Sequence, residues 1–364
     1  MAIGMLKKLL VAAFAVGCAA ATASTASHGV ALLRTAPSAG IKHQYSALEL
    51  RGGGAVLENP APAVVQSLEA TEVLHCDNLL GEAPMWHAQE EALYWLDING
   101  EKLWRFHPAS GEQKMWALPE KAGSFAFAEE EGSDFLMGFA SGLSWWDRES
   151  GAVSRICEYE PGMDTRPNDG KCDRQGNFLI GSYNNKHRVD EKNIAGLWRL
   201  NTDLSLQEVL DYRFRCSNTI AFSKDGSQVY FCDTPTREIF RFDYSPTGML
   251  SGKTSFYKME DKDEGGPDGA TVDSQGGLWE AQAGNWRVVR HRASDGVIDY
   301  EVKLPFNNPT SVAVGGDTLY ITTARHRLSD EQRVEQPGAG QLWAVKLPEG
   351  IQGVEEPKFK GCKA

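Results

Sequence analysis

Apolar and polar residues alternate along most of the chain in short runs, and one kind of run recurs. Each begins with aromatic or aliphatic residues, continues through apolar ones and ends in small or acidic ones. These segments start at residues 92, 134, 177, 228, 277 and 318 and read ALYWLDI, DFLMGFA, NFLIGSY, QVYFCDT, GLWEAQA and TLYITTA. Short runs of this kind, rich in aromatic and β-branched residues, predict strands rather than helices.

A second run follows each of these segments, and most of the second runs end in turn residues. They start at 103, 143, 197, 239, 288 and 341 and read LWRFHPASG, LSWWDRESG, LWRLNTD, IFRFDYSPTG, VVRHRASDG and QLWAVKLPEG. Successive repeats begin about 40 to 55 residues apart, which is the period of a four-stranded propeller blade. The pattern therefore predicts an all-β fold, a six-bladed β-propeller with four-stranded blades.

A third run precedes each pair and is predicted to be the innermost strand of its blade. These runs start at 81, 123, 167, 217, 267 and 309. A polar residue stands at the same phase in each of them: Glu82, Ser124, Asn168, Asn218, Asp268 and Thr310. The inner strands of a propeller all enter from one face, so a common phase means a common height along the central channel. We therefore expect these side chains to face one another there.

Carboxylate and amide oxygens of this set are ligands of the type that hard cations such as Ca²⁺, Mg²⁺ or Mn²⁺ prefer. Zn²⁺ more often binds His or Cys, and neither residue stands at this phase. A simpler interpretation exists for the same residues. Asn168-Asp169-Gly170 and Asp268-Gly269 are common turn sequences, and polar residues at a channel mouth also bind water.

The chain before the repeats has the composition of a targeting segment. Lys7 and Lys8 precede the apolar run LLVAAFAVGCAAATA, and Ala21-Thr22-Ala23 is an A-x-A cleavage sequence. These features predict a signal peptide over 1–23 and entry into the secretory pathway. Residues 24–70 are predicted to be a transit-like or propeptide segment and linker. A bipartite presequence for a plastid and plain secretion both fit.

Domain boundaries follow from these assignments. The propeller is predicted to span 71–350, and 351–364 is predicted to be a C-terminal tail. The formal net charge of −12 gives no electrostatic case for binding nucleic acid or an anionic membrane surface. The stretch GMLSGKT at 248–254 is one residue short of a phosphate-binding loop and is predicted to be a turn.

Four motifs together resemble a known family. GEAP at 81–84, RPNDGKCD at 166–173, SNTIAFS at 217–223 and PDGATVD at 267–273 are similar, in sequence and in order, to motifs of the senescence marker protein (regucalcin)/gluconolactonase family. The resemblance extends over residues 75–347. It implies a six-bladed β-propeller and a metal-dependent hydrolase that opens sugar lactones.

The resemblance also implies roles for single residues. The ligands of one divalent metal ion, Ca²⁺ or Zn²⁺ with Mn²⁺ or Mg²⁺ as further options, would be Glu82, Asn218 and Asp268. The residues that contact or adjoin the substrate would be Arg166, Asn168 and Asp169. Asp268 is the expected catalytic base, because it would touch both metal and water. The insertion NNKHRVDEKN at 184–193 is predicted to form a lid at the channel mouth.

Three functions are compatible with this sequence. The first is a gluconolactonase-like enzyme that opens sugar lactones to aldonic acids. The second is a metal-dependent esterase or organophosphatase on the same propeller, because a fold does not fix a substrate. The third is a non-catalytic calcium-binding propeller. The expected partner is a small sugar lactone. No binding to nucleic acid is expected, and none to a membrane in the mature form. The protein is expected to be a monomer.

Overall fold

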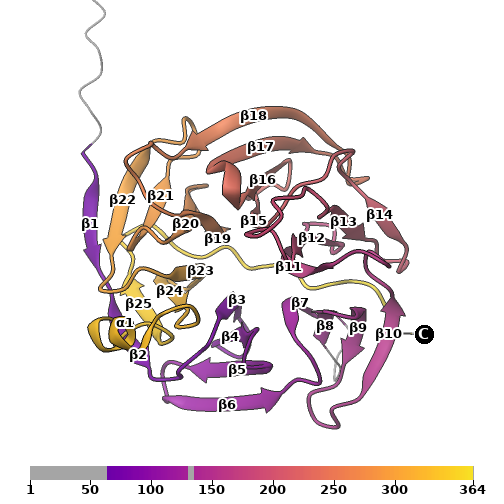
Figure 1. Ribbon diagram of the computed structural model, residues 1–364, viewed down its shortest axis with the longest axis horizontal. Helices are drawn as coiled ribbons and strands as arrows, with labels where there is room; N and C mark the ends of the chain where they lie inside the picture. Colours follow the sequence, from indigo (N-terminus) through magenta and orange to yellow (C-terminus); the bar gives the residue numbers. More distant parts are fainter. Residues whose placement is uncertain (1–63, 130–134, 364) are drawn as a thin grey trace, which may run out of the picture. The chain divides into compact units, whose positions relative to one another are not determined.

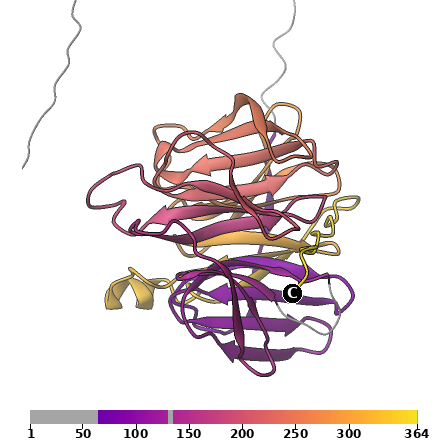
Figure 2. The same ribbon diagram turned by 90° about the vertical axis from the view of Figure 1, so that its right-hand side faces the viewer.

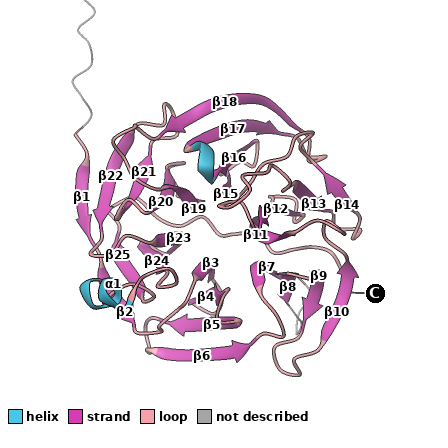
Figure 3. Cartoon of the chain, in the orientation of Figure 1, coloured by secondary structure: helices cyan, strands magenta, loops and turns pink. Residues whose placement is uncertain are grey.

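The computed structural model describes residues 64–129 and 135–363. These residues form six β-sheets, arranged as blades around a central axis (Figure 1). Strands make up nearly all of their regular structure (Figure 3). The described part adds two short helices, α1 (Asp330–Glu335) and the 3-10 helix η1 (Thr234–Thr236). The predicted six-bladed β-propeller is thus confirmed.

The first three blades follow one another directly along the chain, each from its innermost to its outermost strand. Blade 1 contains β3 (Gly81–His87), β4 (Ala92–Asp97), β5 (Lys102–His107) and β6 (Glu112–Ala117). Blade 2 contains β7 (Ala122–Phe127), β8 (Phe135–Phe139), β9 (Gly142–Trp146) and β10 (Val153–Cys157). Blade 3 contains β11 (Thr165–Cys172), β12 (Phe178–Asn184), β13 (Leu197–Leu200) and β14 (Leu206–Glu208).

The last three blades continue the same order. Blade 4 contains β15 (Ser217–Phe222), β16 (Gln228–Asp233), β17 (Glu238–Tyr244) and β18 (Leu250–Lys258). Blade 5 contains β19 (Gly266–Val272), β20 (Leu278–Ala283), β21 (Arg287–His291) and β22 (Ile298–Lys303). Blade 6 contains β23 (Pro309–Gly315), β24 (Thr318–Thr323) and β25 (Leu342–Lys346).

The N-terminal side of the propeller completes the last two blades. β2 (Thr71–Leu74) pairs antiparallel with β25 and is the outermost strand of blade 6, so it closes the ring. β1 (Gln66–Glu69) pairs in parallel with β22 at the edge of blade 5. Residues 66–69 fall in the segment predicted to be linker, and they form a strand because a free sheet edge lies beside them. The predicted signal peptide, 1–23, and residues 24–63 lie outside the described residues.

The hydrophobic core is divided into clusters that lie between neighbouring blades. Tyr94 of blade 1 packs with Phe125 and Trp146 of blade 2, for example, and Trp279 of blade 5 packs with Ile321 of blade 6. Burial is greatest in the inner strands and least in the outer ones. All of β4, β7 and β15 is buried, whereas β6 and β18 are largely exposed. Inter-blade packing therefore fixes the inner strands that line the channel.

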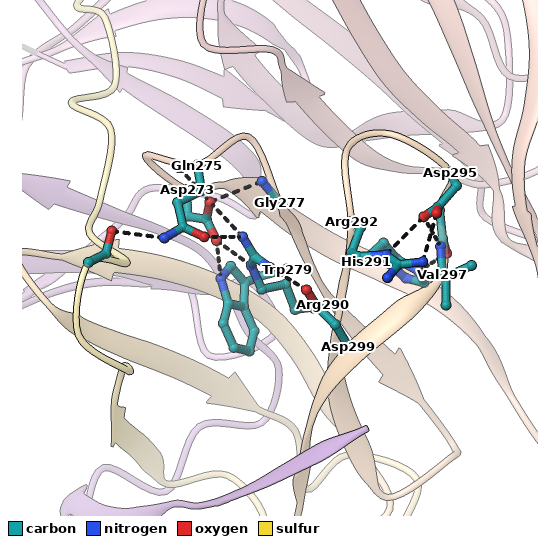
Figure 4. Close-up of polar contacts among 12 residues, drawn as sticks. Asp273, Gln275, Gly277, Trp279, Arg290, His291, Arg292, Asp295, Val297 and Asp299 are labelled. Atoms are coloured by element: carbon teal, nitrogen blue, oxygen red, sulfur yellow. Dashed lines mark hydrogen bonds and ion pairs between the residues drawn. The ribbon is translucent and has the colours of Figure 1, made fainter. Parts of the chain in front are cut away.

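An aspartate after the innermost strand ties the turn of its blade together. In blade 5, Asp273 accepts hydrogen bonds from Trp279 Nε1 (2.9 Å) and Arg290 Nε (2.6 Å), and from the backbone of the turn that follows it (Figure 4). In blade 3, Asp173 accepts corresponding bonds from Arg199 Nε and from the turn backbone. These carboxylates are fully buried, and each is paired with an arginine, as a buried charge requires.

The C-terminal segment, residues 351–363, crosses the end of the channel at which the inner strands finish (Figure 1). Gly353 bridges to Asp273 after β19, and Phe359 bridges to Ala128 after β7. Phe359 is completely buried against Trp145. Figure 2 shows this segment on one face and α1 projecting from the other. The predicted tail is thus part of the packed structure and leaves the opposite end of the channel for the site.

One alternative interpretation is excluded and one prediction about a turn is wrong. Asn168, Asp169 and Gly170 lie within β11, and Asp268 lies within β19, so neither sequence forms a hairpin turn. The stretch predicted as a turn at 248–254 is strand from Leu250 onward, because it pairs with β17 as the outer strand of blade 4. No helix in the described part of the chain is long and apolar enough to cross a membrane.

Candidate functional site

A cavity of about 690 Å³ opens at the end of the channel where the inner strands begin. Five of the six side chains predicted to share one height line it: Glu82, Asn168, Asn218, Asp268 and Thr310. Ser124, the sixth, is completely buried in β7. Arg166 of β11 also lines the cavity. The structure thus brings together the sequence-predicted site residues, apart from Ser124 and Asp169.

A β-bulge at each of these positions turns the polar side chain toward the channel. The pairing of each inner strand with its neighbour shifts at the site residue or directly after it. The shifts lie between Glu82 and Met85 in β3, between Pro167 and Gly170 in β11, between Asn218 and Ala221 in β15, and between Pro267 and Ala270 in β19. A bulge bends a strand and redirects a side chain, and bulges are common beside active sites. The residues that share a phase in the sequence therefore also share a bulge in the structure.

Hydrogen bonds link the site residues of blades 3, 4 and 5 in a chain. Arg166 Nη1 donates to Asn168 Oδ1 (2.7 Å), and Asn168 Nδ2 donates to Asn218 Oδ1 (3.0 Å). Asn218 Nδ2 donates to Thr234 Oγ1 (2.7 Å), and Thr234 Oγ1 donates to the Pro267 carbonyl (2.8 Å). Each amide is thereby held in one orientation. Asn218 Oδ1 keeps a second lone pair for a ligand in the cavity.

The acidic residues of the site repel one another. Burial and the neighbouring Asp169 raise the pKa of Glu82 to about 8, while Arg166 opposes this rise. Burial, Glu82 and Asp169 raise the pKa of Asp268 well above its usual range, and Arg327 opposes that rise. Such a group of carboxylates is stabilised either by protons or by a cation.

Asp169 lies beside the cavity and does not line it. Its Oδ2 accepts a hydrogen bond from the Ile220 backbone N–H of the next blade (2.7 Å). Burial raises the pKa of Asp169 to about 6, and Lys171 opposes this rise. The residue thus binds β11 to β15 at the level of the two asparagines, which is a positioning contact.

The insertion predicted to be a lid forms part of the cavity wall. Its residues His187, Arg188 and Glu191 line the cavity together with Tyr183, which precedes the insertion. The guanidinium of Arg166 stacks on the Tyr183 ring, 4.2 Å from the ring centroid. The His187 ring contacts the same Tyr183 ring edge-on, with 4.6 Å between the ring centroids. Asn184 holds the loop in place through bonds from its Nδ2 to Asp190 and to the Lys192 carbonyl.

Several cavity residues were missed by sequence reasoning. Thr234 lies in η1, and His326 and Arg327 lie between β24 and α1. All of them belong to connections between strands, where no periodic pattern marks their direction. The only available signal was their position just after a strand that ends at the channel mouth.

No group of three or more His, Cys, Asp or Glu side chains within residues 64–129 and 135–363 has the arrangement of a metal site. The set around Glu82 and Asp268 depends on asparagine oxygens to reach the number of ligands that a hard cation needs. The residue types fit such a cation, because all the donors are oxygens and, among the described residues, neither Glu82 nor Asp268 forms an ion pair.

Comparisons with known proteins identify the family to which the chain belongs. A model of the SMP-30/Gluconolactonase/LRE-like region matches residues 80–325. The chain is 38% identical over 294 residues to L-arabinolactonase of Azospirillum brasilense, with 80% of this chain and 96% of that protein covered. It is 33% identical over 298 residues to 6-deoxy-6-sulfogluconolactonase of Pseudomonas putida, with coverages of 80% and 99%.

A solved structure is similar over the whole propeller. Regucalcin from Agrobacterium tumefaciens, described as a calcium-binding protein, superimposes with a TM-score of 0.74 at 25% identity, covering 81% of this chain and 99% of that one. The family match and the similarity of the fold thus agree. The chain belongs to the SMP-30/gluconolactonase/LRE-like family.

Proposed function

We propose that this protein is a divalent-metal-dependent lactonase that opens sugar lactones to aldonic acids. The observation that carries the proposal is the convergence of Glu82, Asn218 and Asp268 on one cavity, with Arg166 and Asn168 beside them. The names of two relatives, an L-arabinolactonase and a 6-deoxy-6-sulfogluconolactonase, support a sugar lactone as substrate.

Glu82, Asn218 and Asp268 would hold the cation. Their oxygens suit Ca²⁺, Mg²⁺ or Mn²⁺, and the relative described as a calcium-binding protein supports Ca²⁺; Zn²⁺ is also a candidate. When bound, such a cation supplies Lewis-acid polarisation of the lactone carbonyl. Its positive charge would also favour the ionised forms of Glu82 and Asp268, whose pKa is raised by burial and by the neighbouring carboxylates.

The protein's own residues would position the reactants and move the proton. Asp268 takes a proton from the attacking water as the bond between the water oxygen and the carbonyl carbon forms. The ring C–O bond then breaks, and the ring oxygen takes the proton from Asp268 and leaves as a hydroxyl group, which returns Asp268 to its carboxylate form. Arg166, fixed by Asn168 and by Tyr183, donates hydrogen bonds to the carbonyl or to a sugar hydroxyl. Asn168 in turn fixes the direction of Asn218.

The test is a substrate panel on the full chain supplied with Ca²⁺, Mn²⁺, Mg²⁺ or Zn²⁺. Wild type and Asp268→Asn would be assayed on glucono- and arabinonolactones, on simple esters and on a phosphotriester. We expect the lactones to be turned over fastest and Asp268→Asn to lose that turnover. Faster turnover of the phosphotriester or the esters would favour the second function. Metal binding without turnover of any substrate would favour a calcium-binding role.

A further inference from the structure

Two arginines at the cavity mouth have no hydrogen-bond or ion-pair partner among the residues that the structure describes. Arg188, in the loop after β12, and Arg327, between β24 and α1, line the cavity and are exposed. Within the part of the chain that the structure describes, neither side chain forms a hydrogen bond or an ion pair. Two guanidinium groups from blades 3 and 6 therefore face the same cavity with their donors free.

Other arginines of the cavity are committed to protein groups. Arg166 is bound to Asn168 and stacked on Tyr183. Arg237 donates to the carbonyls of Glu260 (2.9 Å) and Asp263 (2.6 Å). Arg215 is placed 3.9 Å from Glu191. Arg188 and Arg327 differ from these three arginines, because no hydrogen bond or ion pair to another described residue explains their presence.

The charge at the mouth is not balanced by its surroundings. Burial and the nearby positive charges of Arg188 and Arg327 lower the pKa of His187 and of His326 to about 4, so both imidazoles are neutral near pH 7. The carboxylates of Glu82 and Asp268 would be neutralised by the cation of the proposed function. A positive mouth then remains on a chain whose formal net charge is −12. Such a local reversal of sign attracts anions.

We propose that the preferred substrates are sugar lactones that carry an acidic group, a carboxylate, phosphate or sulfonate, at the end remote from the reacting carbonyl. This inference rests on the proposed lactonase function. Glu82, Asn218, Asp268 and Arg166 would bind the lactone carbonyl end, and Arg188 and Arg327 would bind the acidic end. Guanidinium groups suit this task because their planar set of donors matches the oxygens of a carboxylate or phosphate.

A neutral lactone would leave these two arginines without a function in recognition. Its hydroxyl groups need hydrogen-bond partners but no positive charge. An anionic lactone would also be drawn into the cavity by the field at its mouth, an effect that weakens as salt screens the charges. A preference for the charged substrate that falls with ionic strength is therefore the signature of this arrangement.

The experiment compares two lactones that differ only at carbon 6. D-glucono-1,4-lactone ends in a hydroxymethyl group and D-glucaro-1,4-lactone in a carboxylate, and both hydrolyse slowly without enzyme. A second pair, glucono-δ-lactone and 6-phosphoglucono-δ-lactone, distinguishes a carboxylate from a phosphate preference. The variants are Arg188→Gln and Arg327→Gln, with Arg327→Lys to restore the charge. Arg325→Gln is the control, because Arg325 is paired with Asp77 (2.7 Å).

We expect wild type to prefer the charged member of at least one pair in kcat/KM. Each Gln variant should reduce that preference about ten-fold, as loss of one charge-assisted hydrogen bond predicts. Arg327→Lys should restore part of it, 0.5 M NaCl should weaken it, and Arg325→Gln should leave it unchanged. Equal kcat/KM for the neutral and charged lactones would overturn this inference and leave the lactonase function intact. Absence of turnover of every lactone would overturn both.

Discussion

At the scale of the residue, the site is held by backbone conformations that its own sequence does not favour. Ala83 and Thr219 follow Glu82 and Asn218, and both have positive φ, 49° and 59°. Such a conformation costs roughly 1–3 kcal/mol for a residue other than glycine. Thr219 Oγ1 donates to the Asp268 carbonyl at 2.8 Å, which helps to hold the strained residue. The strain lies where the bulges aim the side chains that we propose as metal ligands, as is common at functional sites.

Arg166→Lys tests the role of a guanidinium group that lines the cavity. A lysine cannot keep both the stacking on Tyr183 and the bonds to Asn168 Oδ1 and the Pro167 carbonyl. We expect KM for glucono-δ-lactone to rise about ten-fold, with a smaller fall in kcat, since substrate positioning is lost first. Steady-state kinetics measure both values. Arg292→Lys, an exposed residue paired with Asp295, is the control, and an unchanged KM in Arg166→Lys would contradict the assignment.

The raised pKa of Glu82 predicts how the metal-free protein depends on pH. Glu82 keeps its proton in the folded state up to about pH 8 but loses it near 4.5 when unfolded. The folded state therefore binds more protons between these values, so the free energy of unfolding falls as pH rises through this window. Asp169, with a pKa of about 6, acts in the same direction.

Thermal unfolding of the chelated protein from pH 5 to pH 8 measures this effect. We expect the Tm to fall with pH and Glu82→Gln to reduce the slope. A cation at 100 times its Kd should add about 2.7 kcal/mol at pH 8, which corresponds to a rise on the order of 5 °C. A Tm that is independent of pH without metal would show that burial and the neighbouring carboxylates do not raise the pKa of Glu82 and Asp169 in the folded protein.

At the scale of the element, neighbouring inner strands approach so closely that glycine is required between them. A Cβ on Gly123 of β7 would lie 2.0 Å from the Pro167 carbonyl oxygen and 2.8 Å from the Asn168 nitrogen. One on Gly269 of β19 would lie 2.0 Å from Ser311 Oγ of β23. The spacing of the inner strands, and with it the width of the channel at the site, therefore depends on residues that carry no chemistry themselves.

Gly123→Ala is expected to displace β11 and the side chains that it supports. The added methyl group meets backbone rather than a flexible side chain, so the strand must move. Overpacking of this kind costs roughly 1–3 kcal/mol, and lactone turnover should fall together with the Tm because Asn168 shifts. Urea unfolding and kinetics on the same preparation measure the two effects. Ala140→Ser, at an exposed position of the same blade, is the control; normal turnover in Gly123→Ala would show that β11 tolerates the methyl group.

At the scale of the whole molecule, the N-terminal strand β2 and the C-terminal segment close different parts of the propeller. β2 completes blade 6 and closes the ring, while the C-terminal segment crosses the far end of the channel. There Glu356 forms an ion pair with the buried Lys171 (3.0 Å), whose Nζ also donates to the Ala270 carbonyl. The channel is thus closed by protein at one end and open to substrate at the other.

Phe359→Ala is predicted to destabilise the whole propeller without altering the site. Phe359 is completely buried between blades 2 and 3, and loss of such a ring costs roughly 3–5 kcal/mol. We expect a clear fall in Tm, with kcat/KM close to wild type at temperatures where the variant stays folded. Differential scanning calorimetry and low-temperature kinetics provide the two values. Cys362→Ser, at an exposed position, should change neither, and a wild-type Tm for Phe359→Ala would show that the C-terminal segment is not part of the folded unit.

Strand repeats allowed the fold and much of the site to be predicted. The inner strands are buried between blades, so their apolar pattern is strong and the common phase of Glu82, Asn168, Asn218 and Asp268 is visible in the sequence. The outer strands were harder to predict because residues exposed on both faces need no alternation; β18, read in part as a turn, is an example. Neither the bulges nor the placement of Arg188 and Arg327 has a local sequence signal, since both depend on how neighbouring blades pack.

The most direct test of the account is metal-dependent hydrolysis by the full chain. The protein is stripped with a chelator, and proton release from glucono-δ-lactone is followed while Ca²⁺, Zn²⁺, Mn²⁺ or Mg²⁺ is added back to wild type and to Glu82→Gln. We predict turnover that requires a cation, saturates with its concentration and is lost in Glu82→Gln. Turnover by the stripped enzyme at the wild-type rate, or unchanged turnover in Glu82→Gln, would contradict the metal-dependent site proposed at the channel mouth.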